Sequence, residues 1–140
     1  MKLASSLFAA VMLLSPTLSS ATTAYDITFK LNNSLSYDSI DISIDYSIAD
    51  GDFSGSGATV SCTPNGSLNA IMAFNEASQV VWSGVMSTTP IAGPVVLFTC
   101  IFDSNGAAPV AGDFFIYLRG WSSSSTSTAP AIQISSIQVH

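Results

Sequence analysis

The sequence predicts an all-β fold, a two-sheet antiparallel sandwich of about eight strands that follows a secretory signal peptide. Three observations lead to this prediction. Apolar and polar residues alternate with period two along most of the chain after its first 21 residues. Short turn segments rich in Gly, Pro, Asn and Asp separate the alternating stretches. No window after the N-terminal stretch keeps the 3.6-residue apolar period of an amphipathic helix.

The first 21 residues have the order of a signal peptide. Lys2 precedes an apolar run from Leu3 to Leu14, and the small residues Ser19 and Ala21 suit the cleavage positions. The run is shorter than the ~20 residues that span a bilayer, which disfavours the competing interpretation of a membrane anchor. Cleavage after Ala21 leaves 119 residues, 22–140, enough for one domain with one core. We expect a secreted or periplasmic protein with no membrane insertion after cleavage.

The eight expected strands cover 25–31, 40–46, 59–62, 68–74, 80–86, 95–102, 114–118 and 132–139. The glycine-rich stretch 51–57 is expected to form a turn-rich connection. We expect Thr89-Pro90 and Gly93-Pro94 to lie in the connection that follows 80–86. Because 95–102 is apolar at both phases, it is expected to be a central strand covered on both sides. A β-bulge at Ser135-Ser136 would bring the apolar residues on either side of it to one face.

Cys62 and Cys100 are the only cysteines, in a chain routed to an oxidising compartment. The simplest interpretation is one disulfide, and the phase of Cys100 on its strand points it between the sheets. A metal site or a catalytic thiol would need further ligands or a base, and His140 is the only histidine. We therefore predict a disulfide and no metal site or cofactor.

The charge balance excludes two classes of partner. The cleaved chain keeps Lys30 and Arg119 against nine acidic residues, a net charge of −7. Such a surface repels phosphate backbones and anionic lipids, so nucleic acids and membrane surfaces are not expected partners.

The sequence also predicts that the protein is not an enzyme. Its one histidine stands at a chain end expected to fray, and no pair of carboxylates stands out. Oxygen ligands gather near glycines at 50–52 and 103–106, but neither segment continues as an EF-hand loop, so turn chemistry is favoured over calcium. Trp82 and Trp121 are candidates for stacking on a sugar ring. Core packing is the competing role for both, and the sequence does not settle which face Trp82 occupies.

The order of features from residue 39 to residue 139 resembles a cohesin domain, the jelly-roll β-sandwich module that receives dockerin domains. The residues that carry the resemblance are Ile40-Asp-Ile-Ser-Ile-Asp-Tyr46, Ala70-Ile-Met-Ala-Phe74, Gly93-Pro-Val-Val-Leu-Phe-Thr-Cys-Ile-Phe102, Asp113-Phe-Phe-Ile-Tyr-Leu118 and 134–139. Two features depart from the family pattern. The segment before Ser39 supplies one strand where cohesins usually have two, and the cysteine pair is not a general family feature.

The resemblance implies a secreted, non-catalytic module that attaches to a protein partner of dockerin type. The partner-facing sheet would include the strand that bears Asp41, Ser43 and Asp45, whose side chains point away from its isoleucines. Carbohydrate-binding modules share the same architecture, so polysaccharide recognition through Trp82 or Trp121 is the alternative. A structural subunit of a surface fibre or matrix is a third.

Overall fold

The computed structural model describes residues 21–66, 68, 70–76 and 79–140. The predicted signal peptide, apart from Ala21, lies outside the described residues. The described part of the chain forms two antiparallel sheets, as expected for a β-sandwich. Its only helix is a single 3-10 turn, and no helix within these residues is long and apolar enough to cross a membrane.

The elements in chain order are β1 (Thr23–Leu31), β2 (Ser36–Asp45), β3 (Gly51–Phe53), β4 (Gly55–Ser56), β5 (Thr59–Val60), β6 (Cys62–Pro64), β7 (Ala70–Glu76), β8 (Val80–Ala92), β9 (Val95–Ser104), the 3-10 helix η1 (Ala111–Asp113), β10 (Phe115–Ser122) and β11 (Ile132–Val139). The eleven described strands exceed the eight expected. The difference arises in 51–64, where the glycine-rich chain forms four pieces of two or three residues each. Gly57, at φ 62°, occupies the left-handed conformation that the turn between β4 and β5 requires.

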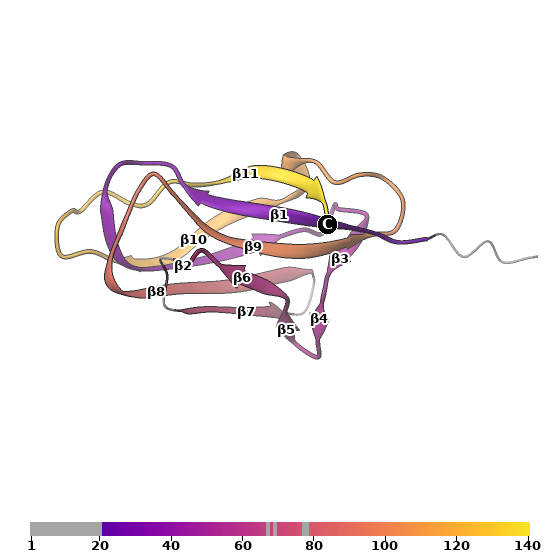
Figure 1. The fold of residues 1–140 in the computed structure, drawn as a ribbon, viewed down its shortest axis with the longest axis horizontal. Coiled ribbons are helices and arrows are strands. Elements are labelled where there is room, and N and C mark those ends of the chain that lie inside the picture. Colours follow the sequence, from indigo (N-terminus) through magenta and orange to yellow (C-terminus); the bar gives the residue numbers. More distant parts are fainter. Residues whose placement is uncertain (1–20, 67, 69, 77–78) are drawn as a thin grey trace, which may run out of the picture.

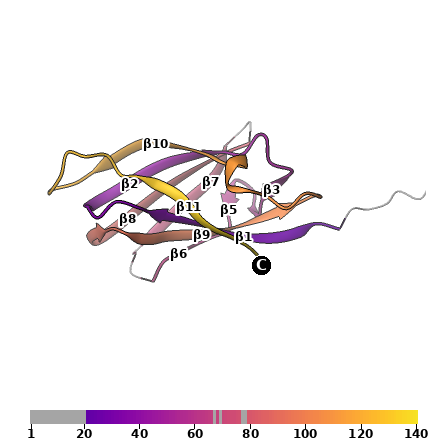
Figure 2. The ribbon, with the colours of Figure 1, turned by 90° about the horizontal axis from the view of Figure 1, so that it is seen from above.

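One sheet has five strands in the order β11-β1-β9-β3, with β6 pairing beside β3 along the same edge of β9. The other has six strands in the order β10-β2-β8-β7-β5-β4. Figure 1 shows β1 (indigo) running between β11 (yellow) and β9, and Figure 2 shows the same strands from above. The backbone N–H of His140 donates to the carbonyl of Ala24, so the C-terminus lies beside the start of β1.

The hydrophobic core fills the space between the sheets. Its fully buried members come from both sheets and include Ile27, Phe29, Phe98, Phe102, Ile40, Ile42, Ile44 and Val81. An edge-to-face cluster closes one end, where Phe102 contacts Phe53, Phe114 and Tyr46 at ring-centroid distances of 5.2, 5.3 and 6.1 Å. Such pairs add to the stabilisation that area burial provides.

The predicted bulge in the last strand is confirmed. Thr28 pairs with Ser136 and Phe29 with Ile134, so Ser135 is the extra residue. A second bulge in β9 places Leu97 opposite no residue of β1, which allows the adjacent Leu97 and Phe98 both to be buried.

Two expectations about strands are wrong. Thr89-Pro90 does not lie in a connection, because β8 continues through both residues. Residues 87–90 form an irregular bulge opposite Asp38, so the missing N–H of Pro90 breaks no ladder bond. β9 is central but only one of its faces is fully buried: Phe98, Cys100 and Phe102 alternate with the half-buried Thr99 and Ile101. Its apolar outward residues therefore reflect strand propensity rather than a covering layer.

Candidate functional site

The outer face of the six-stranded sheet brings together most of the residues that the sequence singles out. On β2, the buried Ile40, Ile42 and Ile44 alternate with half-buried Asp41 and Ser43. Side chains directly opposite each other in an antiparallel pair share a face. The register can therefore be followed from β2 to its two neighbours.

Each outward residue of β2 has a neighbour on both sides. Tyr117 of β10, Ser43 of β2 and Trp82 of β8 form one cross-strand row. A second row joins Gly120, Asp41 and Gly84, and a third joins Phe115, Asp45 and Val80. The outward residues of these rows, with Met86 of β8, which pairs with Ser39, define what we call the outer face. Its residues are Phe115, Tyr117, Gly120, Asp41, Ser43, Asp45, Val80, Trp82, Gly84 and Met86.

Large apolar side chains on this face are unusually exposed. Tyr117 is 55% exposed, Met86 48% and Phe115 45%, while Trp82 is half-buried. Aromatic side chains of this kind dominate the energetics of binding surfaces when a partner covers them. The outer face thus combines aromatic area with the acids of β2.

Asp41 lies at the centre of the outer face, between two glycines. A Cβ atom on Gly84 would lie 2.9 Å from its Oδ1, and one on Gly120 would lie 3.7 Å from its Oδ2. The same Gly84 position is 3.5 Å from Cζ2 of Trp82, so the indole and the carboxylate converge there. Within the described residues the Asp41 carboxylate accepts no hydrogen bond, which leaves its oxygens free to accept one from a ligand.

The Asp45 carboxylate, unlike that of Asp41, accepts a hydrogen bond within the protein. Its Oδ1 accepts the backbone N–H of Ser47 at 2.9 Å, in the manner of an Asx-turn. This backbone hydrogen bond, with a further one from the Ser47 side chain, lowers the pKa of the Asp45 carboxyl below its usual 3.8. Asp45 therefore stabilises the turn after β2, whereas Asp41 has no such structural task.

The two tryptophans lie on opposite sides of their sheet. Trp82 points to the outer face in register with Ser43, whereas Trp121 pairs with Ile40, whose side chain is buried in the core. The Trp121 ring is half-buried and contacts Tyr37 edge-to-face at a centroid distance of 5.8 Å. Only Trp82 therefore stands beside Asp41, Ser43 and Asp45.

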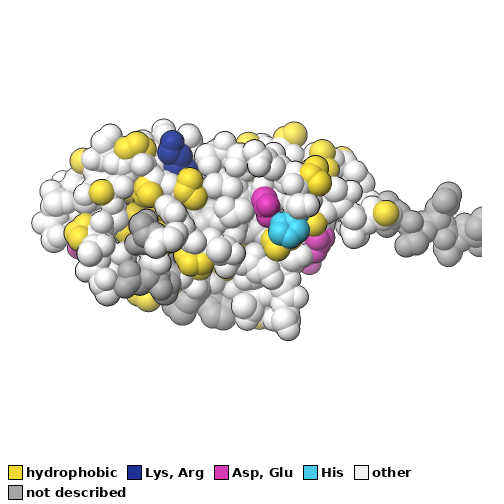
Figure 3. All heavy atoms as spheres, in the orientation of Figure 1, with side chains coloured by type: hydrophobic (Ala, Val, Ile, Leu, Met, Phe, Trp, Pro, Cys, Tyr) yellow, Lys and Arg dark blue, Asp and Glu magenta, His cyan; other side chains and the backbone are white. Residues whose placement is uncertain are grey.

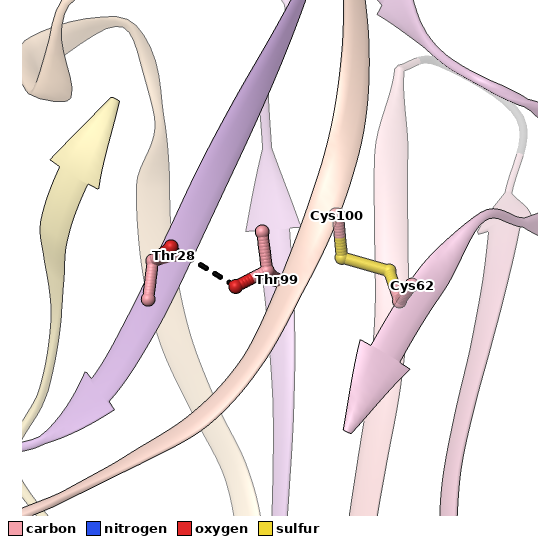
Figure 4. Close-up of a disulfide and its surroundings, with 4 residues drawn as sticks. All are labelled: Thr28, Cys62, Thr99 and Cys100. Carbon is pink, nitrogen blue, oxygen red and sulfur yellow. Dashed lines mark hydrogen bonds between the residues drawn. A yellow bond between two sulfur atoms is a disulfide. The ribbon is translucent and has the colours of Figure 1, made fainter. Parts of the chain in front are cut away.

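The predicted disulfide between Cys62 and Cys100 is confirmed, and it joins β6 to β9 within the five-stranded sheet. Cys100 is fully buried in the core, as its phase predicts. Figure 4 shows Thr28 and Thr99 beside it, with their hydroxyls 3.0 Å apart. The disulfide anchors a strand of only three residues to the centre of the sheet, on the layer opposite the outer face.

The two acidic turn segments weighed for calcium lie side by side, since Asp52 pairs with Asp103. Their carboxylates accept hydrogen bonds from the protein itself. Asp52 accepts from the Tyr46 hydroxyl at 2.5 Å, Asp103 accepts from the Ser54 hydroxyl, and Asp50 accepts from the N–H of Ala107 at 3.4 Å. Each of these three carboxylates therefore has a hydrogen-bond partner within the protein.

His140 is held rather than frayed. Its Nδ1 lies 2.8 Å from Oδ1 of Asp26, and its backbone N–H bonds to Ala24. Figure 3 shows this single histidine against an acidic side chain on a surface with few charged groups. The pair belongs to the five-stranded sheet and is half exposed, at 51% for His140 and 39% for Asp26.

Sequence reasoning did not single out six residues of the outer face: Phe115, Tyr117, Gly120, Val80, Gly84 and Met86. The run from Phe114 to Leu118 is apolar at every position, so its period gives no face. Only the pairing with β2, whose alternation is clear, assigns Phe115 and Tyr117 to the outside.

No family model matches this chain, and neither the curated proteins nor the solved structures contain a significant match.

Proposed function

We propose that this protein is a secreted, non-catalytic binding module that receives its ligand on the outer face of the six-stranded sheet. The signal-peptide pattern and the disulfide support export to an oxidising compartment. The observation that carries the proposal is the Asp41 carboxylate, which accepts no hydrogen bond among the described residues and lies beside the indole of Trp82. An available acceptor next to exposed aromatic area favours binding of a ligand that brings hydrogen-bond donors and apolar surface.

A protein partner of dockerin type is the first candidate, as the resemblance to cohesin domains implies. The outer face spans β10, β2 and β8, so it is broad rather than a pocket. Trp82 and Tyr117 flank Ser43 in one row, and aromatic anchors surrounded by polar groups are typical of protein interfaces. Asp41 would pair with a cation or a hydroxyl of the partner.

Non-catalytic action is part of the same proposal. General acid-base chemistry near neutral pH most readily uses histidine. The single histidine pairs with Asp26 in the five-stranded sheet, away from the outer face. The acids of the outer face are partly exposed, where burial does not tune them for proton transfer.

Polysaccharide binding is the second candidate, and the convergence of Trp82 and Asp41 favours it. An indole can stack on the apolar face of a sugar ring while a neighbouring carboxylate accepts its hydroxyls. Both groups approach the α-carbon of Gly84, so the indole and the carboxylate lie next to each other on the outer face.

One experiment separates the two candidates. Exported wild type and the variants Asp41→Ala and Trp82→Ala are immobilised and exposed to culture fluid of the source organism, then tested for retention on cellulose, chitin and other insoluble polysaccharides. Ile101→Ala, an outward residue of the opposite sheet, is the matched control. Protein capture that Asp41→Ala abolishes and Ile101→Ala preserves supports the first candidate.

Retention on polysaccharide without a protein partner, lost in Trp82→Ala, would replace the first candidate by the second. Binding of either kind that all three variants retain would contradict the outer face as the site.

A further inference from the structure

β10 is the terminal strand of the six-stranded sheet and pairs only with β2 among the described strands. Its first four residues, Phe115-Ile-Tyr-Leu118, are all large, apolar and uncharged. Phe115, Tyr117 and Leu118 are 45%, 55% and 39% exposed, and Ile116 is half-buried. The strand therefore presents an apolar edge.

Natural edge strands are usually protected by charges, prolines or bulges, because their free backbone groups pair readily with another strand. Residues 115–118 have none of these devices, and the bulge of β10 begins only at Arg119. A surface hollow of about 400 Å³ lies beside the strand, lined by Phe114, Ile116, Ile132 and neighbouring residues of β10 and β11. Both the edge and its inner side are thus open to a partner.

We propose that two copies of this chain associate by antiparallel pairing of their β10 strands about a two-fold axis at Ile116. A two-fold axis perpendicular to the sheet keeps the faces of both copies on the same sides, so paired residues must share a face. With the axis at Ile116, Phe115 faces Tyr117 on the outer side and Phe114 faces Leu118 on the inner side. Every pair of the central segment is apolar.

Charge complementarity selects this register. Asp113 and Arg119 are the only charged residues from 106 to 140 apart from the terminal His140, and each stands three positions from Ile116. Pairing about Ile116 brings Asp113, in η1 just before the strand, toward Arg119 at the bulge of the other copy, once at each end of the apolar segment. A shift to an axis at Phe115 or Tyr117 keeps the faces matched but loses both of these pairs.

The proposed dimer does not depend on the proposed function, but it has a consequence for ligand binding. Both outer faces would lie on the same side of one continuous sheet, so a ligand with repeated sites could engage both copies. Strand-to-strand pairing alone makes a small interface, and small interfaces are typical of weak, transient association. We therefore expect a monomer-dimer equilibrium rather than a permanent dimer.

Sedimentation equilibrium of the exported protein over a range of concentrations tests the proposal. We expect a dimer whose dissociation constant rises about tenfold in Arg119→Asp, because both end pairs become like-charged. The double variant Asp113→Lys/Arg119→Asp restores opposite charges and should recover the wild-type constant. Lys30→Asp makes the same change in net charge on the other sheet and serves as the control.

A second variant tests the strand edge itself. Leu118→Lys places a charge on the edge and should leave only monomer, and circular dichroism with thermal unfolding checks that it remains folded. Hydrogen exchange of wild type should show β10 amides gaining protection as concentration rises. A wild type that stays monomeric up to about 1 mM, or a dimer insensitive to both Arg119→Asp and Leu118→Lys, would overturn the proposal.

Discussion

Asp41 and Trp82 converge on one point of the outer face, the space above the α-carbon of Gly84. A Cβ atom there would lie 2.9 Å from Oδ1 of Asp41 and 3.5 Å from Cζ2 of Trp82. Neither group is needed to fill the core, since the inward side of the same strands carries the fully buried Ile42 and Val81. The absence of a side chain at Gly84 therefore lets two recognition groups come together over its α-carbon.

Gly84→Ala should weaken ligand binding without unfolding the protein. The methyl group must displace the Asp41 carboxylate, because their separation would be shorter than an ordinary contact. The displaced atom is the end of a flexible side chain, so we expect the free energy of unfolding to change by less than about 1 kcal/mol. Binding of the ligand found in the capture assay and urea unfolding would measure both effects.

Gly112→Ala is the control for this substitution, because a Cβ there meets no atom within 4 Å. It should leave binding and stability as in wild type. Unchanged binding in Gly84→Ala would show that the ligand does not depend on the position of the Asp41 carboxylate.

The stability of the protein should depend on pH through Asp45. Hydrogen bonds from the Ser47 backbone and side chain lower the pKa of the Asp45 carboxyl from 3.8, so the folded state favours its ionised form. The contribution is fully present above the unfolded pKa and is lost as pH falls through the lower folded value. Urea unfolding of wild type and Asp45→Asn should therefore show an advantage of wild type near pH 7 that shrinks below about pH 4.

The control is Ser43→Ala, on the same face of β2, which removes no titrating group. The difference in free energy of unfolding between wild type and Ser43→Ala should stay the same between these pH values. A difference between wild type and Asp45→Asn that stays constant with pH would contradict the role assigned to the Asp45 carboxylate.

Removal of the disulfide should destabilise the fold strongly. Cys62 and Cys100 are 38 residues apart in sequence, and closing a loop of this length is worth about 4 kcal/mol in the chain-entropy model. Cys62→Ala/Cys100→Ala should lose roughly that amount in urea unfolding, together with amide protection in β6. Mass spectrometry of the unreduced wild type should show the loss of two hydrogens, and two alkylated thiols in native exported protein would contradict the pairing.

Ser83 is a polar residue in the core with an unsatisfied hydroxyl group. It lies on the inward side of β8, is fully buried, and its Oγ has no hydrogen-bond partner among the described residues. Replacing an unsatisfied buried hydroxyl by hydrogen removes a desolvation cost, so Ser83→Ala should raise the free energy of unfolding by about 1 kcal/mol. Thermal unfolding beside the exposed control Ser124→Ala measures this, and a destabilised Ser83→Ala would imply a bond made by that hydroxyl.

The sequence predicted the fold class, the disulfide and the outward phase of Asp41 and Ser43, because each rests on local alternation or on chain chemistry. The face of Tyr117 could not be predicted from its own apolar run, since a strand assigns such residues only through its register with a neighbour. The continuation of β8 through Pro90 could not be predicted for a related reason. A bulge opposite Asp38 lets the ladder resume beyond the proline, and bulges depend on the partner strand.

Substitution of Trp121 should mainly affect stability, and substitution of Trp82 should mainly affect ligand binding. Trp121 packs edge-to-face on the buried Tyr37, so Trp121→Ala should lower the free energy of unfolding by about 2 kcal/mol, less than for a fully buried tryptophan because its ring is half-buried. Trp82→Ala should instead reduce ligand binding, with a smaller loss of stability, because its ring lies on the outer face. Urea unfolding and the capture assay, run on both variants, give four values. Binding lost in Trp121→Ala while its stability is unchanged would move the binding site from the outer face to the end of the sandwich around Tyr37.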